Sequence, residues 1–321
     1  MPKDRNRFVD GAMNTRIAVL IPCYNEAAAI GGVVAAFKKA LPEASIYVYD
    51  NNSTDETIAV AEAAGAHVRT EGVQGKGNVV RRMFADVEAD VYVLVDGDDT
   101  YDARDAPTMI HYLMQGQLDM VNGMRVESEP DAYRWGHRFG NRFLTSVVAV
   151  FFGNTFKDLL SGYRVFSRRF VKTFPALSSG FEIETELTVH ALEMRMKVAE
   201  HKTTLRERAE GSESKLQTFR DGWRILRTIL ILIKEERPLS FFVVVGALFA
   251  VISVSIAVPV IIEFIETDKI QRLPTLLLST GLMILSFLSL ANGLILDTVT
   301  RSRRELKRLH YLSYKAPGYF D

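Results

Sequence analysis

The sequence predicts an α/β protein: a Rossmann-like, mostly parallel sheet with helices on both faces, followed by an interfacial helix and a two-helix transmembrane hairpin. Two observations lead to this fold class. Short β-rich runs alternate with alanine-rich helical segments from residue 16 to about residue 125, a pattern typical of parallel sheets. Near the C-terminus, two uncharged apolar runs follow one another, and about 20 apolar residues are enough to cross a bilayer.

The composition limits the function before any motif is considered. The 321 residues are enough for about two domains, and 39 Lys and Arg balance 39 Asp and Glu. A chain without net positive charge is a poor candidate for nucleic-acid binding. A single cysteine excludes a disulfide framework within the chain. The first residues lack the apolar stretch of a secretory signal, which predicts chemistry in the cytoplasm.

The predicted sheet consists of β-rich runs separated by helical segments. The predicted strands are residues 16–22, 45–51, 67–70, 90–96 and 119–124. Residues 26–41 and 55–66, which separate the first three runs, place apolar side chains at helical spacing. Ligands of such sheets bind at the carboxyl ends of the strands. We therefore look for functional residues directly after each run.

The two apolar runs, residues 239–262 and 273–296, predict the membrane hairpin. Their connector is short and slightly acidic, whereas basic residues lie at the outer ends of the hairpin. These basic residues are Lys234, Arg237, Arg301, Arg303, Arg304, Lys307 and Arg308. Basic residues favour the cytoplasmic side, so we expect an integral protein of the cytoplasmic (inner) membrane, with both termini and the catalytic domain in the cytoplasm.

A shorter amphipathic segment precedes the hairpin. Residues 215–236 place four apolar side chains near one face of a helix: Trp223, Leu226, Ile229 and Ile233. This pattern predicts a helix in the membrane interface, although a helix packed on the soluble domain would look similar. Residues 138–152 are too short to span and could also lie against lipid. The predicted boundaries are 1–214 for the catalytic domain, 215–236 for the juxtamembrane helix and 237–321 for the hairpin with its basic tail.

Asp96, Gly97 and Asp98 lie at the carboxyl end of the fourth predicted strand and are the most informative residues. Two carboxylates separated by one small residue can share a divalent cation, while the glycine lets a diphosphate approach the backbone. Mg²⁺ or Mn²⁺ prefers such oxygen ligands and neutralises a leaving group. Alone, the motif is weak evidence, because acidic loops are common and usually only solvated.

The ends of the first two strands supply a second set of polar residues. An aromatic ring, a carboxylate for a base and a carboxylate for a ribose suit a nucleoside, and Tyr24, Asp50 and Glu26 offer these groups. In a parallel sheet they lie at the same edge as the aspartates. Ser53 or Thr54 is also expected to cap the helix that follows.

The Gly75-Lys76-Gly77 segment resembles a phosphate-binding loop only superficially. Gly77 stands where a P-loop has Ser or Thr, and the upstream glycine is misplaced. ATP hydrolysis is therefore unsupported. The segment is either a flexible loop over a donor diphosphate, with Lys76 among the nucleotide-binding residues, or a plain surface turn.

Together these motifs resemble a known family. IPCYNE, DNNSTDET, GKG and DGDD, in this order and spacing, look like glycosyltransferase family 2 with its GT-A fold. The later DLLSGYR and RxxGxxSK segments narrow the resemblance to the polyprenyl-phosphate glycosyltransferases. This group includes the dolichyl-phosphate mannose synthases and the bacterial GtrB-type glucosyltransferases. The resemblance covers roughly residues 14–236, and the hairpin matches the membrane-anchored members.

The resemblance implies roles for individual residues. The nucleotide would be contacted by Pro22, Tyr24, Glu26, Asp50, Asp96 and Gly97, and Asp96 and Asp98 would bind the metal. The diphosphate or the acceptor phosphate would be contacted by Arg125, Arg164, Arg208 and Lys215. The residues assigned to catalysis are Asp98, Asp158 and Arg164. Asp158 would orient Arg164 or the acceptor, act as a base, or serve as a helix cap or structural ion pair. Thr100 stands where some members carry Gln, so a third protein ligand to the metal is not implied.

The expected activity is the inverting, metal-dependent transfer of a hexose from a nucleotide sugar to a polyprenyl phosphate. A UDP-sugar is the first candidate donor and GDP-mannose the second, and the resemblance is consistent with a homotetramer. Two alternatives stay open: a processive polysaccharide synthase and a non-catalytic nucleotide-sugar-binding scaffold. Arg134-Trp135 lacks the glutamine that precedes this pair in processive synthases.

Overall fold

The computed structural model divides the chain into two compact units. It describes residues 15–126, 145–153, 156–206, 218–269 and 271–318. One unit comprises Met1–Thr228 with Lys307–Asp321, and the other comprises Ile229–Leu306. The division differs from the predicted boundaries, because the last residues of the chain group with the α/β unit rather than with the hairpin.

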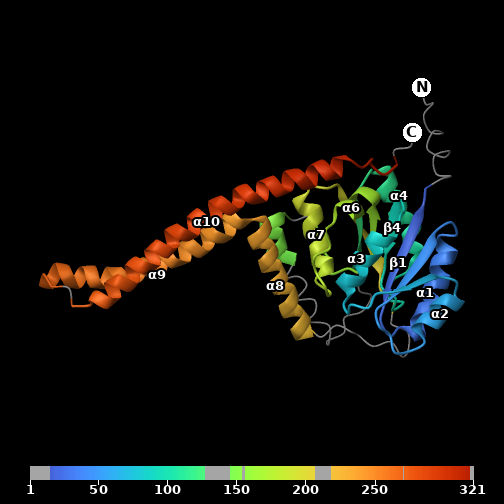
Figure 1. The fold of residues 1–321 in the computed structure, drawn as a ribbon, viewed down its shortest axis with the longest axis horizontal. Helices are drawn as coiled ribbons and strands as arrows, with labels where there is room; N and C mark the ends of the chain where they lie inside the picture. The colour runs from blue at the N-terminus through green and yellow to red at the C-terminus, as the bar shows by residue number, and fades with distance from the viewer. Residues whose placement is uncertain (1–14, 127–144, 154–155, 207–217, 270, 319–321) are drawn as a thin grey trace, which may run out of the picture. The chain divides into compact units, whose positions relative to one another are not determined.

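A seven-stranded, mostly parallel sheet forms the centre of the α/β unit (Figure 1). The strands are β1 (Ile17–Cys23), β2 (Ser45–Asp50), β3 (His67–Thr70), β4 (Val91–Leu94), β5 (Met120–Val126), β6 (Arg164–Ser167) and β7 (Val198–Thr204). Their order is β3-β2-β1-β4-β6-β5-β7. Only β6 runs against its neighbours β4 and β5. The predicted fold class and its first five strands are confirmed.

The sequence did not reveal β6 and β7. β6 has four residues and begins with a charged one, so it is too short and too mixed to show a period. β7 pairs only with β5, at the end of the strand order. Its VAEHKTT sequence is polar, as is common for edge strands.

Helices cover both faces of the sheet. They are α1 (Ala27–Ala40), α2 (Thr57–Ala63), α3 (Lys76–Asp86), α4 (Ala106–Gln115), α6 (Arg168–Thr173) and α7 (Ile183–Glu193), with a short 3₁₀ helix at Ala103–Asp105. Successive β1 residues enter opposite cores: Leu20 packs with α3, α6 and α7, whereas Val19 packs with α1 and α4. Strands buried on both faces read as continuous apolar runs, which explains why β1 and β4 were predictable.

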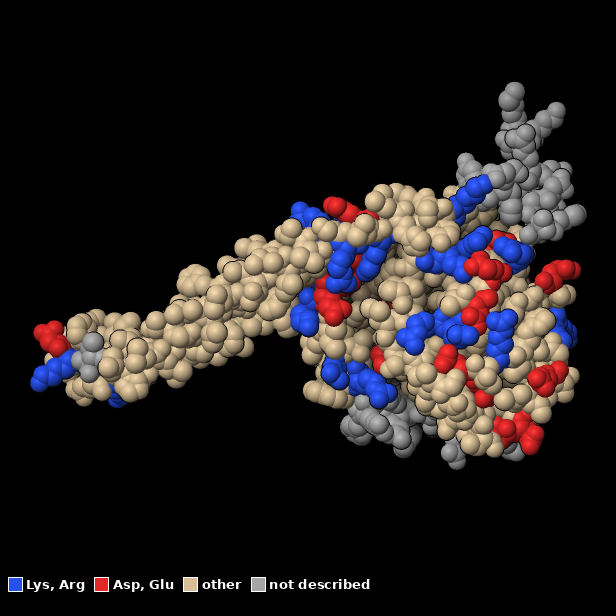
Figure 2. Space-filling model, viewed as in Figure 1, with Lys and Arg blue, Asp and Glu red and all other residues tan. Residues whose placement is uncertain are grey.

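The second unit contains the two long apolar helices. α8 (Thr218–Glu236) leads into α9 (Pro238–Thr267) and α10 (Leu273–Leu312). By length and composition, α9 and α10 could each cross a membrane. Between the connector and Leu296 the surface of the two helices is almost free of charge, whereas the last part of α10 carries many charged residues (Figure 2). α10 continues beyond the predicted span, because the basic residues that follow it are good helix formers.

Small residues at seven-residue spacing join α9 and α10. The Oγ of Ser253 donates to the Ser279 carbonyl at 2.8 Å, and the Oγ of Ser286 donates to the Gly246 carbonyl at 2.8 Å. A side chain on Gly293 would meet the neighbouring helix. Small residues with interhelical hydrogen bonds are the usual means of close packing in a bilayer.

α8 buries two of the four residues that were predicted to share its apolar face. Ile225, Ile229 and Ile233 are buried, whereas Trp223 is 68% exposed. The buried side chains recur every four residues, and Trp223 lies off that line. The interfacial role of α8 stays a prediction. Of the segment 138–152, residues 145–152 are helical and the rest lies outside the described residues.

Candidate active site

Three loops turn sharply at the carboxyl ends of β1, β2 and β4. Each contains a non-glycine residue with positive φ: Asn25 (52°), Asn52 (64°) and Asp99 (58°). This left-handed conformation is uncommon and is best tolerated by Asn and Asp. Because the three strands are parallel neighbours, the turns bring the predicted site residues to one edge of the sheet, which we call the donor edge.

Asn25 joins the first two loops of the donor edge. Its Oδ1 accepts from the Thr54 backbone N–H at 2.7 Å, and its own backbone N–H donates to Ser53 Oγ at 2.8 Å. α2 begins after Glu56 without a side-chain cap. The prediction that Ser53 or Thr54 caps this helix is therefore wrong, because both residues bind across to the β1 loop instead.

The predicted nucleoside residues lie together at this edge. Pro22 is within β1, the ring of Tyr24 is 38% exposed, and Glu26 and Asp50 are buried. Asp50 Oδ2 accepts from the Ser53 backbone N–H at 3.0 Å. Asp50 Oδ1 is buried without a hydrogen-bond partner among the described residues. Because a buried acceptor without a partner is unfavourable, this oxygen is suited to accept from a bound ligand.

The pKa of the Cys23 thiol is sensitive to the negative charge of the donor edge. Burial raises its pKa well above the usual value, and nearby carboxylates raise it further. These carboxylates belong to Glu26, Asp50, Asp96 and Asp98. A raised pKa makes a nucleophilic role for Cys23 unfavourable. A Cβ on Gly97 would lie 2.6 Å from the Cys23 Sγ, so glycine lets the aspartate loop pack on β1.

Lys76 lies among these acidic groups. Its Nζ lies 2.5 Å from Asp96 Oδ1 and 2.6 Å from Glu184 Oε1, and the side chain is 9% exposed. Burial lowers the pKa of Lys76, but the two carboxylates outweigh this effect and raise that pKa above its usual value. Lys76 is therefore a buried, charged lysine at the donor edge.

The glycines around Lys76 hold the start of α3. Gly75, at a φ of 130°, donates its N–H to Asn51 Oδ1 at 2.7 Å. Cβ atoms on Gly75 and Gly77 would lie 2.2 Å from the Ser179 and Ser178 carbonyl oxygens. Both predictions for this segment, a flexible loop and a plain surface turn, are wrong. The segment forms the first turn of α3. Its backbone lies close to the Ser178 and Ser179 carbonyl groups, and only glycine permits this close contact.

Glu184 is a site residue that sequence reasoning missed. It lies in the first turn of α7, where burial raises the pKa of its carboxyl group although Lys76 opposes this shift. Two neighbouring acids are also buried. Glu186 accepts the Leu177 and Ser178 N–H groups at 2.9 and 2.8 Å. Three glutamates in the apolar FEIETEL run were the available signal, because buried carboxylates need specific partners.

Arg125 and Asp158 form a bidentate ion pair beside β5. Arg125 Nε donates to Asp158 Oδ2 at 2.7 Å, and Nη2 donates to Oδ1 at 2.8 Å. Of the roles open for Asp158, the structure shows the ion pair, with Arg125 rather than Arg164 as its hydrogen-bonded partner. Glu200 supports this loop by accepting the Lys157 N–H at 3.0 Å.

Arg164 is fully buried and bonds to the protein itself. Its Nε donates to the Ser161 carbonyl at 3.0 Å and its Nη2 to the Leu159 carbonyl at 2.8 Å. Burial lowers the pKa of this guanidinium. These contacts hold the loop that carries Gly162, where a Cβ would lie 2.2 Å from Asp96 Oδ2. The geometry favours a positioning role for Arg164, and its phosphate contact stays a prediction.

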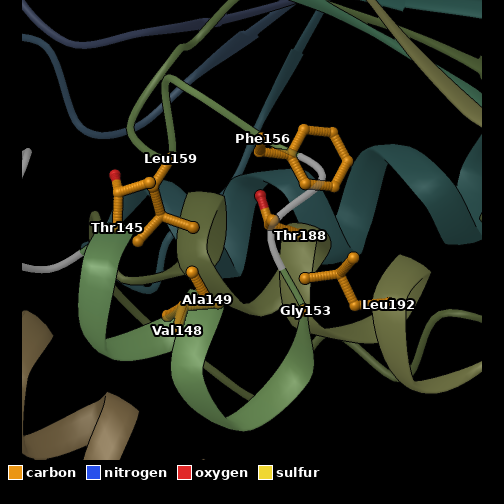
Figure 3. Close-up of a pocket in the computed structure, with 8 residues that line it drawn as sticks. All are labelled: Thr145, Val148, Ala149, Gly153, Phe156, Leu159, Thr188 and Leu192. Carbon is orange, nitrogen blue, oxygen red and sulfur yellow. The ribbon is translucent and has the colours of Figure 1, made fainter.

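Two of the predicted basic residues cannot be placed, and a small cavity near α7 is too small for a substrate. Arg208 and Lys215 lie outside the described residues. A cavity of about 10 Å³ lies beside α7 (Figure 3). It is lined by Thr145, Val148, Ala149, Gly153, Phe156, Leu159, Thr188 and Leu192. This volume is about the minimum needed for a single water molecule, so the cavity cannot hold a nucleotide or a sugar.

The chemistry of the donor edge fits a hard divalent cation. Asp98 is buried, and its Oδ1 accepts from Thr100 Oγ1 at 2.6 Å. Within the described ranges, no three His, Cys, Asp or Glu side chains are grouped as a metal site. Asp96 and Asp98 are the carboxylates that the sequence motif offers as protein ligands. Mg²⁺ is commonly bound by one or two carboxylates together with substrate phosphates, so two aspartates suffice.

Comparison with known proteins identifies the family. The model of glycosyl transferase family 2 matches residues 18–174. Glycosyltransferase AglJ of Haloferax volcanii is 32% identical over 298 residues, which cover 92% of this chain and 98% of AglJ. The chain belongs to glycosyltransferase family 2. The predicted family and enzyme class are thus confirmed for this glycosyltransferase.

Two further proteins resemble this glycosyltransferase. A dolichyl-phosphate hexose transferase of Haloferax volcanii is 28% identical, over 69% of this chain and 95% of that one. The glucosyl-3-phosphoglycerate synthase of Mycobacterium tuberculosis, solved with Mn²⁺, UDP and glucosyl-3-phosphoglycerate, matches with a TM-score of 0.59 at 20% identity. That match covers 71% of this chain and 82% of the synthase. It supports the GT-A fold.

Proposed function

We propose that this glycosyltransferase moves a hexose from a nucleotide sugar to a polyprenyl phosphate, with inversion and with the help of Mg²⁺ or Mn²⁺. The observation that carries the proposal is the group of carboxylates at the donor edge, where Asp96 and Asp98 meet the nucleoside residues. The names of the relatives support a nucleotide-sugar donor and a lipid phosphate acceptor. A UDP-sugar is the first candidate donor and GDP-mannose the second.

The donor would bind across the ends of β1, β2 and β4. The exposed ring of Tyr24 offers a surface for the base, and the buried Asp50 Oδ1 can accept a hydrogen bond from it. Glu26, which is buried at the same edge, would accept from the ribose. Lys76 is placed to contribute positive charge near the diphosphate, because its ammonium already contacts Asp96.

Departure of the nucleoside diphosphate requires charge neutralisation. A bound divalent cation supplies this as a Lewis acid. Asp96 and Asp98 would hold it, and Gly97 lets the backbone of the loop lie close to β1. Thr100 fixes the orientation of Asp98 through its hydroxyl. Fixed ligands of this kind need no reorganisation as charge develops.

The acceptor phosphate is ionised at neutral pH and needs no strong base to attack the anomeric carbon. It needs in-line placement and positive charge. We therefore assign Asp158 to holding Arg125, because a carboxylate occupied by a bidentate guanidinium is a poor base. Arg125 would face the diphosphate or acceptor phosphate, together with Arg208 and Lys215.

The apolar hairpin suits an acceptor that is embedded in a bilayer. α9 and α10 are long and apolar enough to span, and the basic residues at their outer ends favour a cytoplasmic location for both termini. We propose the inner membrane as the location and a homotetramer as the assembly. Both proposals rest on the charge pattern and the family resemblance.

One assay tests the reaction and its rivals together. The full chain in proteoliposomes is given undecaprenyl phosphate and a panel of radiolabelled UDP- and GDP-sugars. We expect label in an organic-extractable lipid from wild type and from the control Asp90→Asn, whose carboxylate pairs with the exposed Arg16. Label in a long water-soluble polymer would indicate a processive synthase. Nucleotide binding without transfer from any donor would indicate a scaffold.

A further inference from the structure

Lys76 links two carboxylates that belong to distant parts of the chain: Glu184 is buried, and Asp96 is 29% exposed. Asp96 follows β4, whereas Glu184 lies in α7, 108 residues from Lys76 along the sequence. The ammonium contacts both carboxylates. The Lys76 Nζ also lies over the ring of Phe181, 5.8 Å from the ring centroid. Asp96, Lys76 and Glu184 therefore form a triad in which one ammonium group pairs with two carboxylates.

The other oxygen of Asp96 is restricted as well. Its Oδ2 faces Gly162, since a Cβ at that position would lie 2.2 Å away. Oδ1 is the oxygen that Lys76 contacts. A cation that binds Asp96 must therefore share this carboxylate with the ammonium or displace it, because two positive charges at one carboxylate repel each other.

Glu184 gives the ammonium a second place to bind. Lysine is a compact point charge on a flexible stem, unlike the planar fork of arginine. The ammonium can shift its contact from Asp96 towards Glu184 without leaving the buried site. A buried charge without a partner would be strongly unfavourable, so without Glu184 the lysine would stay on Asp96.

We propose that Lys76 is the resident counter-ion of Asp96 and competes with the divalent cation for this carboxylate. Glu184 is the positioning residue that receives the ammonium when the cation binds. The inference rests on the proposed metal site at Asp96 and Asp98. It gives Lys76 and Glu184 linked roles in setting the affinity of the enzyme for its cation.

The test measures Mn²⁺ binding rather than activity. Free Mn²⁺ is followed by electron paramagnetic resonance during titration of the full detergent-solubilised chain without nucleotide. Lys76→Met should bind Mn²⁺ about tenfold more tightly, and Glu184→Gln about tenfold more weakly, within the usual range of coupling between sites. In the Lys76→Met background, Glu184→Gln should change the affinity by less than about twofold, because no ammonium is left to place.

The double variant separates competition from simple electrostatics. If the two charges act independently, Glu184→Gln will weaken binding by the same factor with and without Lys76, and the proposal is overturned. Unchanged affinity in folded Lys76→Met also overturns it. Equal binding by wild type and Asp98→Asn is a different failure, since it removes the proposed metal site itself.

Two controls guard against misfolding. Lys172→Met removes a largely buried lysine that pairs with Glu88, away from the donor edge, and should leave Mn²⁺ affinity unchanged. Thermal unfolding identifies variants that do not fold. If Lys76→Met is one of them, the double variant still decides the question, because it removes both charges of the Lys76–Glu184 pair. Competition predicts that it binds Mn²⁺ more tightly than Glu184→Gln alone by more than about tenfold, and a smaller gain contradicts the proposal.

Discussion

Two buried carboxylate clusters lie at opposite edges of the same sheet. At the donor edge, Asp96 contacts one lysine, and the surrounding acids still raise the pKa of the Cys23 thiol. At the other edge, Asp119 precedes β5 and is fully buried. The Arg169 fork, the Ser167 hydroxyl and further donors bind it there.

The Asp119 cluster is complete within the protein. Its Oδ2 also accepts from the Tyr311 hydroxyl at 3.0 Å and the Lys197 N–H at 3.3 Å. The guanidinium of Arg169 lies over the Tyr311 ring, 4.7 Å from the centroid. A guanidinium group that donates to both oxygens of a carboxylate, as Arg169 does to Asp119, holds it in a fixed geometry. Burial of charge alone therefore does not mark a site. The donor edge differs from the Asp119 cluster in having a buried oxygen without a partner among the described residues, Asp50 Oδ1, and an excess of neighbouring carboxylates.

Asp98→Asn should produce the largest effect on activity. Loss of one of two anionic ligands leaves the departing diphosphate without its cation, and we expect a loss of transfer on the order of 10³-fold. Thermal stability should change little, because the substitution removes one negative charge from a group of neighbouring carboxylates. Initial rates with saturating Mn²⁺ and a melting curve measure both quantities. Full turnover in excess EDTA would contradict the metal requirement.

Asp119→Asn should show the opposite pattern. Removing a buried charge leaves Arg169 without its partner, and breaking such a pair costs about 3–5 kcal/mol of folding stability. The folded fraction should keep its kcat/KM, since Asp119 is far from the donor edge. Chemical denaturation and rates at low temperature test this. A large loss of activity in a stably folded variant would remove the distinction between the clusters.

Tyr311→Phe should have a smaller effect of the same kind. It deletes one hydrogen bond to a buried carboxylate, and bonds to charged groups are worth about 1.5–3 kcal/mol. Tyr311 belongs to the C-terminal residues that group with the α/β unit. A lowered melting temperature with unchanged transfer is expected. Unchanged stability would mean that these residues contribute little to the unit.

The smallest effect concerns pH and His190 on α7. Burial, and next the charge of Lys307, lowers the pKa of His190 to about 3, below the usual value of about 6.5. At pH values between about 3 and about 6.5, the unfolded chain therefore binds a proton at His190 more strongly than the folded chain does. Stability is therefore complete above about pH 6.5 and falls by up to about 1.4 kcal/mol per pH unit as the pH decreases. His190→Gln should show a flatter stability profile over pH 5–7; an identical slope would exclude His190.

The sequence predicted the parts of the fold and site that depend on local order. β1 and β4 are continuous apolar runs, and the motifs directly after them mark the donor edge. The Lys76–Glu184 contact could not be predicted, because 108 residues separate its members and only tertiary packing joins them. The partner of Asp158 was missed for the same reason. The apolar pattern of α8 also did not predict which of its residues are buried, because α8 offers more apolar positions than it buries.

The central claim is that the donor edge uses a divalent cation to pass a hexose to a lipid phosphate. The most direct measurement follows radiolabel from a nucleotide sugar into extractable lipid in proteoliposomes, with EDTA and after Mn²⁺ is restored. Wild type should transfer label only with the cation, and Asp98→Asn should transfer almost none in either condition. Equal transfer by the two proteins, or transfer by wild type in EDTA, would contradict the account.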